Sequence, residues 1–178
     1  METAVRDILQ QFQDGYTQRD IENLDTFMQL FAPQDDIEMI GIGASVRDGY
    51  EWFQGSAAIR EIIESDWTYW GEVTFDVSRA QITILDNIAW LSTAGTLTQT
   101  DTFDEALPFY LNQMKEMLEA EGEAPIDKMM EATHFGLRRL RDKQKGVGYK
   151  WALVLTAVLV RINDEWKFHT LHWSMPVD

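Results

Sequence analysis

The sequence predicts an α+β domain in which a curved antiparallel sheet packs on N-terminal helices and carries an inserted helical hairpin. Apolar residues recur at helical spacing through the first third of the chain, alternate with a period of two in two later stretches, and return to helical spacing between them. Helices followed by runs of strands are typical of α+β proteins. At 178 residues the chain can bury a substantial core, so we expect a single domain spanning residues 1–178.

The first third of the chain predicts three helices. The first presents the apolar stripe Val5, Ile8, Leu9, Phe12 and Tyr16. Asp20 can cap a second helix, which Pro33 stops. After the short strand DDIEMIG, the segment SAAIREIIESDW predicts a third helix, whose apolar stripe through Ile59 and Ile62 continues to Asp66.

Two pairs of antiparallel strands are predicted next. The segments EVTFDVSRAQITIL and NIAWLSTAGTLTQ alternate apolar and polar residues and are joined near Asp86-Asn87. The segments YKWALVLTAVLVRI and EWKFHTLHWSM form the second pair, joined at Asn163-Asp164, which suits a two-residue hairpin turn. These pairs would form the body of the curved sheet.

The stretch from about residue 102 to 146 predicts the helical hairpin. Its segments, PFYLNQMKEMLEAEG and PIDKMMEATHFGLRRLRDKQKG, begin at Pro108 and Pro125, and proline suits the first turn of a helix. Their methionines suit a lid over an apolar ligand, and equally a structural hairpin or a contact with a partner subunit. The second segment also holds a basic cluster, which suits an anionic partner or a solvated helix face: Arg138, Arg139, Arg141, Lys143 and Lys145.

Composition excludes several classes of function. A net charge of −15 argues against binding to nucleic-acid phosphates or to an anionic membrane surface, so we expect neither partner. The absence of cysteine excludes disulfides, thiolate zinc sites and cysteine nucleophiles. The N-terminus METAVRDILQQF has no signal-peptide pattern and the longest apolar run, ALVLTAVLV, is too short to span a bilayer, so we expect a cytoplasmic protein.

Four phrases in a fixed order carry a family resemblance: LFAPQDDIEMIG, EWFQGSAAIREIIESDW, NIAWLSTAGT and LTAVLVRINDEWKFHTLHWS. The sequence resembles the SnoaL-like branch of the nuclear transport factor 2-like superfamily over about three quarters of the chain, leaving out the predicted hairpin. The resemblance implies a cone-shaped fold, in which a bent sheet wraps a long helix and leaves an open pocket, and it implies a homodimer. Family members include polyketide cyclases, ketosteroid isomerases, dehydratases and kinase association domains, so the resemblance predicts fold better than chemistry.

The ketosteroid isomerase mechanism does not carry over to this chain. The position of the isomerase general base is occupied by Met39, that of the oxyanion tyrosine falls near Phe12, and that of the second oxyanion acid near Val158. All three are apolar, so no proton acceptor or donor remains there. Association domains carry two histidines in the last strand, and here Thr170 replaces the first while His172 remains.

The terminal strand, EWKFHTLHWSMP, concentrates histidine and tryptophan. Alternation places His169, Leu171, Trp173 and Met175 on one face, and Trp166, Phe168, Thr170, His172 and Ser174 on the other. The two histidines then point to opposite sides and cannot share a metal ion, so we expect neither a metal nor a cofactor. By the resemblance, the Trp173 face lines the pocket and the other face is a candidate subunit interface, although one bulge would reverse this assignment.

The polar centre of the expected pocket is formed by Asp66 and His169. A desolvated carboxylate facing an imidazole could exchange a proton with a ligand. The alternatives are that Asp66 lies in solvent at a helix end and that His169 lines the pocket but takes no part in catalysis. The expected walls of the ligand pocket are Trp90, Ser92, Trp173, Leu171, Met39, Ile62 and Val158.

Three functions remain open from the sequence. The chain can be a pocket protein that binds a small, largely apolar organic molecule in the cone. It can be an enzyme of proton-transfer chemistry, such as cyclisation, isomerisation or dehydration of a cyclic ketone-like substrate. It can also be an oligomerising module. A paired carboxylate and imidazole in the pocket would favour the enzyme, and a pocket filled by its own side chains would favour the oligomerising module.

Overall fold

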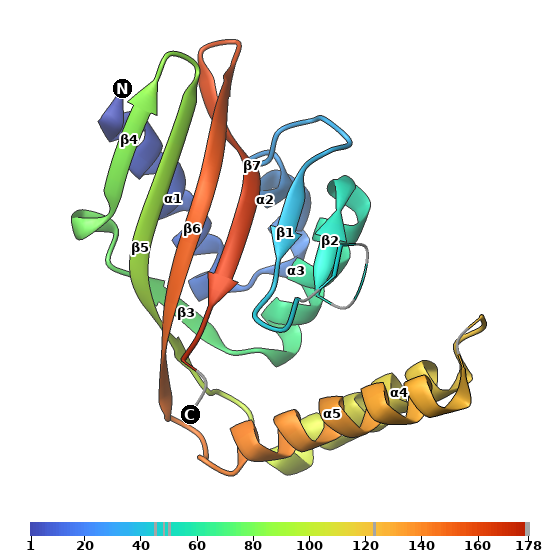
Figure 1. The fold of residues 1–178 in the computed structure, drawn as a ribbon. Coiled ribbons are helices and arrows are strands. Elements are labelled where there is room, and N and C mark those ends of the chain that lie inside the picture. Colours follow the sequence, from blue (N-terminus) through green and yellow to red (C-terminus); the bar gives the residue numbers. More distant parts are fainter. Residues whose placement is uncertain (45, 48, 50, 123, 177–178) are drawn as a thin grey trace. The chain divides into compact units, whose positions relative to one another are not determined.

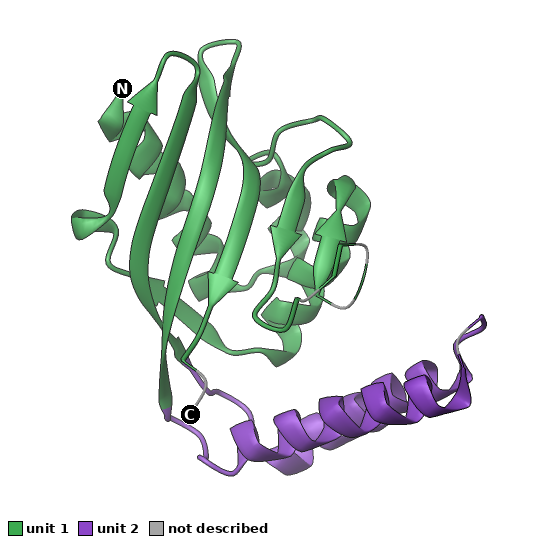
Figure 2. Ribbon diagram, in the orientation of Figure 1, with its two compact units in different colours: residues 1–97, 150–178 green, residues 98–149 purple. Residues whose placement is uncertain are grey.

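The computed structural model describes residues 1–44, 46–47, 49, 51–122 and 124–176 (Figure 1). The chain forms two compact units, distinguished by colour in Figure 2. Residues 1–97 and 150–178 form the first, which we call the sheet unit, and residues 98–149 form the second, the hairpin unit. Within the described ranges, no helix has both the length and the apolar character that crossing a membrane requires.

The sheet unit is built on one curved sheet (Figure 1). Its strands are β1 (Glu38–Ile40), β2 (Trp52–Gln54), β3 (Glu72–Phe75), β4 (Gln81–Leu85), β5 (Ile88–Thr98), β6 (Lys150–Ile162) and β7 (Glu165–Ser174). They lie in the order β2-β1-β7-β6-β5-β3, with β4 also paired to β5. The pairs β1–β2, β4–β5 and β6–β7 are antiparallel, whereas β1 runs parallel to β7, so the sheet is mixed.

Three α-helices belong to the sheet unit: α1 (Glu2–Gln18), α2 (Leu24–Met28) and α3 (Gly55–Tyr69). The predicted stripe on α1 is confirmed, since Val5, Leu9, Phe12 and Tyr16 are fully buried. Asp20 does act as a cap, but of the short 3₁₀ turn Ile21–Asn23 that precedes α2, where its side chain accepts from the backbone N–H of Glu22.

The first predicted strand pair differs from expectation in one strand. The segment Glu72–Leu85 is divided into β3 and β4 by the 3₁₀ turn Val77–Arg79. Asp76 causes this break, because its carboxylate accepts from the backbone N–H of Arg79 at 3.3 Å and so caps the turn. Apolar and polar residues alternate both before and after the break, which is why the sequence predicted one strand, but the alternation changes phase there: Val73 and Phe75 are odd positions, whereas Ile82 and Ile84 are even.

A β-bulge in β7 decides which side chains face the helices. The turn at Asn163-Asp164 is confirmed, with positive φ at both residues and Ile162 paired to Glu165. The register then shifts, because Leu159 pairs with Phe168 but Val158 pairs with Thr170, leaving His169 as the extra residue. As a result Trp166, Phe168, Leu171 and Trp173 are all buried on the face that α1 covers.

The aromatic core fills the space between α1 and the sheet. Phe12 lies at its centre, with ring centroids between 5.0 and 6.3 Å from those of Tyr16, Phe27, Phe31, Phe75, Phe168 and Trp173. Each of these rings is buried. Burial of aromatic area on this scale is the main stabilising contribution that the sequence offers to the sheet unit.

The hairpin unit consists of α4 (Phe103–Glu119) and α5 (Pro125–Lys143) packed on each other. Pro125 opens α5 as predicted, but α4 begins before Pro108, which lies inside the helix. The reason is a capping box, in which the Thr102 side chain accepts from the Glu105 N–H and the Glu105 carboxylate accepts from the Thr102 N–H. Between the helices Tyr110 and Phe135 are buried, with ring centroids 6.0 Å apart.

Candidate functional site

A buried hydrogen bond joins α1 to α3 inside the sheet unit. The hydroxyl of Tyr16 donates to Oδ2 of Asp66 at 3.0 Å. Tyr16 is fully buried, whereas Asp66 is half-buried near the C-terminal end of α3. Three tryptophans surround the pair, with ring centroids 5.5 Å (Trp173), 6.3 Å (Trp67) and 6.4 Å (Trp70) from that of Tyr16. We call these five residues the Tyr16–Asp66 cluster.

Local sequence explains how the cluster is assembled. Tyr16 lies one helical turn beyond Phe12 on the buried stripe of α1. Its neighbour Gly15 has no side chain, and Phe27 and Trp67 occupy the space that a Cβ would fill. Trp67 therefore packs directly across α1, and this contact brings the adjacent Asp66 within reach of the Tyr16 hydroxyl.

Two hydrogen-bond donors of the cluster lack an acceptor. The indole N–H groups of Trp67 and Trp173 are buried and have no hydrogen-bond partner among the described residues. A buried donor without an acceptor costs about 1–3 kcal/mol of stability. Native proteins keep few such groups, and each calls for an explanation, such as strain, a catalytic role, or a bound water or ion. The cluster thus combines apolar aromatic walls with two donors that an oxygen atom of a ligand could satisfy.

The Tyr16 phenol stays protonated over the whole physiological range. Burial raises its pKa well above the ordinary value of 10, and the adjacent Asp66 carboxylate raises it further by its charge and by accepting the hydrogen bond. The phenol therefore acts as a fixed donor to Asp66 rather than as a proton source for a ligand. In the described part of the chain, no three histidine or carboxylate side chains gather as they would around a metal ion.

The structure does not join Asp66 to His169, the two residues expected to form a proton-exchanging pair. His169 is the extra residue of the β7 bulge, with Nε2 3.4 Å from Oδ1 of Asp36 and Nδ1 3.0 Å from Oγ1 of Thr170. Asp66 instead accepts a hydrogen bond from the Tyr16 hydroxyl. The alternative for Asp66, that it lies in solvent at a helix end, holds only in part, because the residue is near the end of α3 but is half-buried.

The seven expected pocket residues are divided between the two faces of the sheet. Met39, Leu171 and Trp173 are buried on the helix side, and Ile62 packs against the same core. The other three, Trp90, Ser92 and Val158, lie on the outer face, which is the face turned away from α1. The bulge explains the division, because without it Val158 would pair opposite His169 and share its face.

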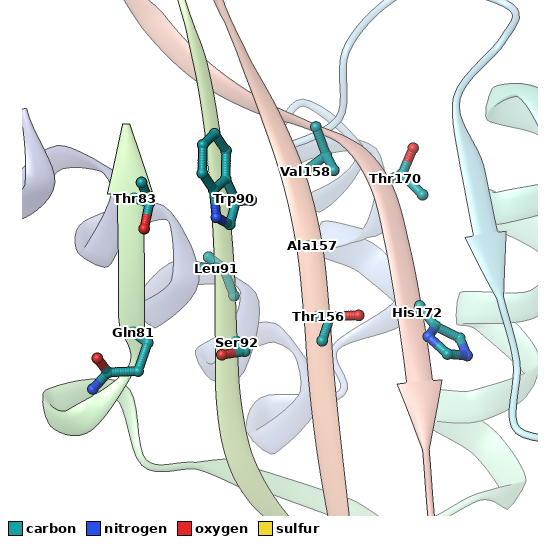
Figure 3. Close-up of a pocket in the computed structure, with 10 residues that line it drawn as sticks. All are labelled: Gln81, Thr83, Trp90, Leu91, Ser92, Thr156, Ala157, Val158, Thr170 and His172. Atoms are coloured by element: carbon teal, nitrogen blue, oxygen red, sulfur yellow. The ribbon is translucent and has the colours of Figure 1, made fainter. Parts of the chain in front are cut away.

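The outer face holds a hollow of about 320 Å³ (Figure 3). It is lined by Gln81, Thr83, Trp90, Leu91, Ser92, Thr156, Ala157, Val158, Thr170 and His172. Trp90 stands on β5 opposite Thr83 of β4, and 46% of its surface is exposed. Among the described residues that line the hollow there is no Asp, Glu, Lys or Arg, although a quarter of the chain is charged. Trp166 and Phe168, once expected on a subunit interface here, are buried in the core instead.

Tyr16 is the residue of the inner cluster that sequence reasoning did not select. It was recognised only as the last member of an apolar stripe. A hydroxyl on a fully buried helix face needs a hydrogen-bond partner, and this requirement was the available signal. Asp66 continues the apolar stripe of α3, the next long helix, so helical spacing made it a candidate partner for the Tyr16 hydroxyl.

The comparison with known proteins identifies the family. A family model described as the SnoaL-like domain matches residues 5–111, which is more than half of the chain. The chain belongs to the SnoaL-like domain family. We found no similar sequence among curated proteins. The matched range includes Tyr16, Asp66 and Trp90, but not Trp173.

Solved structures show that this SnoaL-like chain has the nuclear transport factor 2-like fold. A nuclear transport factor 2-like superfamily protein from Salmonella enterica aligns with a TM-score of 0.61 and 11% identity, covering 99% of this chain and 92% of that one. A ketosteroid isomerase-like protein from Erwinia carotovora aligns with a TM-score of 0.59 and 12% identity, covering 99% of this chain and 96% of that one. A nuclear transport factor 2-like protein of unknown function from Pseudomonas putida aligns with a TM-score of 0.59 and 14% identity, covering 99% of this chain and 87% of that one. Identities this low establish the cone-shaped α+β fold alone.

Proposed function

We propose that this SnoaL-like protein binds a small, largely apolar organic molecule at the Tyr16–Asp66 cluster, through one oxygen atom of the ligand that accepts a hydrogen bond. The observation that carries the proposal is the pair of buried indole donors, Trp67 and Trp173, for which the described residues provide no acceptor. Aromatic walls favour an apolar ligand, and a few placed donors fix its orientation. The absence of cysteine fits the cytoplasm, which is the compartment we propose.

The ligand would enter where the cluster meets solvent. Asp66 and Trp70 are half-buried, whereas Tyr16, Trp67 and Trp173 are closed off by protein. Trp70 stacks edge-on against Trp173, with centroids 5.2 Å apart. Because Trp70 is the half-buried ring that covers Trp173, it is the side chain that would move aside to expose the indole donor of Trp173 to a ligand.

Binding is favoured over proton-transfer catalysis at this site. Cyclisation, isomerisation or dehydration requires a group that takes up a proton and a second that returns it or holds the developing charge. The Tyr16 proton is committed to Asp66, and the imidazole of His169 contacts Asp36. The cluster thus offers one carboxylate and two neutral donors, which are sufficient to hold a ligand.

Calorimetric titration with 1-tetralone tests the proposal, with tetralin as the matched ligand that lacks the carbonyl. We expect 1-tetralone to bind more tightly than tetralin. The Trp173→Phe variant keeps an apolar ring but loses the donor, so it should weaken 1-tetralone binding by about fivefold, the worth of a neutral hydrogen bond of roughly 1 kcal/mol. The Trp90→Phe variant on the outer face serves as control. Equal affinity for both ligands, or equal loss in both variants, would contradict the proposal.

The outer face favours a second function, self-association as a homodimer. Two copies of a chain with net charge −15 repel each other, and a contact surface without charged side chains adds no local repulsion to this. The outer hollow is such a surface, and Trp90 stands beside it with its ring half-exposed. In a twofold dimer the same patch serves both subunits, so the Trp90 ring of one copy can enter the hollow of the other. Under this proposal Trp90→Glu abolishes the contact, which analytical ultracentrifugation would detect as a loss of mass.

A further inference from the structure

Helix α5 carries an apolar stripe that the hairpin unit leaves exposed. Ala132 and Phe135 face α4 and are buried. On another side of α5, five large apolar residues are exposed: Ile126, Met129, Met130, Leu137 and Leu140. Positions 126, 130, 137 and 140 follow helical spacing, so they share one face, and Leu137 is 61% exposed there. A contiguous exposed patch of this kind marks an interaction surface.

The charges beside this stripe change sign along the helix. Asp127 and Glu131 lie along one edge of the stripe in the first half of α5. Arg138 and Arg141 lie along the same edge in the second half, because all four positions fall within about a quarter turn of one another around the axis. One edge of α5 is therefore acidic at its start and basic at its end.

We propose that two copies of the chain associate through α5, with the two helices antiparallel and their exposed stripes in contact. A twofold axis beside His134 places Met130 of each copy against Leu137 of the other. It also places Asp127 of each copy at the level of Arg141 of the other, since the two residues lie about 10 Å from His134 on opposite sides. The contact then contains two symmetric ion pairs beside an apolar seam.

The charge pattern selects a second copy, in this orientation, as the occupant. In a parallel twofold pair this edge would face the opposite edge of the second helix, so Asp127 and Arg141 of the two copies would not meet. A uniformly acidic partner would be repelled by Asp127 and Glu131, and a uniformly basic one by Arg138 and Arg141. Only a helix that carries the same change of sign, read in the opposite direction, is complementary over the whole edge, and the chain itself provides such a helix.

Neither member of the main ion pair is held by a strong partner now. Asp127 has no ion pair among the described residues. Arg141 contacts the adjacent Asp142, with Nη2 3.2 Å from Oδ1, and the Arg141 side chain is half exposed. Such exposed pairs contribute little to stability, so Arg141 can turn toward a carboxylate of a second copy.

Two charge-reversed variants of the full chain test the inference, Asp127→Lys and Arg141→Glu. Each variant alone sets like charges against each other twice in the antiparallel pair, so its dimer dissociation constant should rise by at least about tenfold. An equimolar mixture of the two should associate as tightly as the wild type. In the mixed dimer, the lysine introduced at position 127 of one copy faces the glutamate introduced at position 141 of the other, and the second pair keeps its native aspartate and arginine. Sedimentation equilibrium gives the constants, and circular dichroism confirms that both variants keep their helices.

The design separates this contact from the one proposed on the outer face of the sheet. If both contacts exist, Trp90→Glu and Leu137→Asp each leave a dimer and their combination a monomer. If association is lost only in Trp90→Glu, or if the mixture of charge variants associates no better than each variant alone, the α5 contact is refuted. Restored association in the mixture supports the α5 contact even if Trp90→Glu has no effect. Ligand binding at the Tyr16–Asp66 cluster is independent of each result.

Discussion

Replacing Gly15 by alanine tests the packing that forms the inner cluster. A glycine-to-alanine change inside a helix normally stabilises a protein by about 0.5–1 kcal/mol. Here the new Cβ would lie less than 3.0 Å from two ring carbons of Phe27 and 3.2 Å from Cζ2 of Trp67. Phe27 cannot retreat, because its ring is 4.9 Å from that of Trp67 and 5.4 Å from that of Phe12, centroid to centroid.

Overpacking of a filled core costs about 1–3 kcal/mol, which exceeds the gain in helix propensity. We therefore expect Gly15→Ala to lower the free energy of unfolding by about 1–2 kcal/mol. Urea titration followed by circular dichroism measures this as a lower midpoint with an unchanged slope. Gly136→Ala in α5 is the matched control, since its Cβ would meet only the flexible end of Met114, at 3.1 Å. If both variants were equally stable or stabilised, Phe27 and Trp67 would not be packed across α1.

Three further predictions follow from the fold. The raised pKa of Tyr16 means that the folded state holds this proton more tightly than the unfolded state, so stability is complete below about pH 10 and falls as the pH rises further. Tyr16→Phe should reduce that alkaline loss, as measured by urea titrations at pH 8 and pH 11. Thr102→Ala removes the capping box of α4 and should lower stability by about 1 kcal/mol, seen as reduced helical signal on heating. Inserting an alanine after Thr170 moves Leu171 and Trp173 one position along β7 and turns them to the outer face, so cooperative unfolding should be lost. Deleting His169, the extra residue of the bulge, keeps Leu171 opposite Ala157 and should leave a folded protein.

Each of these has a clear contrary result. An alkaline loss of stability that is the same in wild type and Tyr16→Phe would mean that another group titrates on unfolding. A Thr102→Ala variant that melts like the wild type would mean that the N-terminus of α4 gains nothing from its cap. A protein that still unfolds cooperatively with the inserted alanine would mean that the fold does not require Leu171 and Trp173 on the inner face of β7.

Most of the fold follows from patterns that the sequence displays. The buried stripe of α1, the turn at Asn163-Asp164 and the helical hairpin each rest on local chemistry: helical spacing, two residues that tolerate positive φ, and helix-starting residues. Local patterns of this kind survive in the folded chain because tertiary packing reinforces them. The break at Asp76 was missed because its capping bond depends on a side chain that is also common within loops and strand ends.

The candidate site was harder to predict because it depends on one inserted residue. His169 and Thr170 are both half-buried, so neither marks the bulge by a misplaced apolar side chain. Simple alternation therefore assigned Val158 and Trp173 to one face, although they lie on opposite faces. A hydrogen bond between two long helices, such as Tyr16 to Asp66, also depends on their crossing, which no local pattern encodes.

The central claim is that the indole N–H groups of Trp67 and Trp173 in the Tyr16–Asp66 cluster donate to an oxygen atom of a ligand. Nuclear magnetic resonance of the seven indole N–H groups tests this claim most directly. Addition of 1-tetralone to ¹⁵N-labelled protein should move the Trp173 resonance, and that of Trp67, downfield, while the Trp90 resonance stays in place. Tetralin should produce no downfield movement. If Trp67 and Trp173 respond equally to both compounds, or if Trp90 alone responds, the ligand site does not lie at the Tyr16–Asp66 cluster.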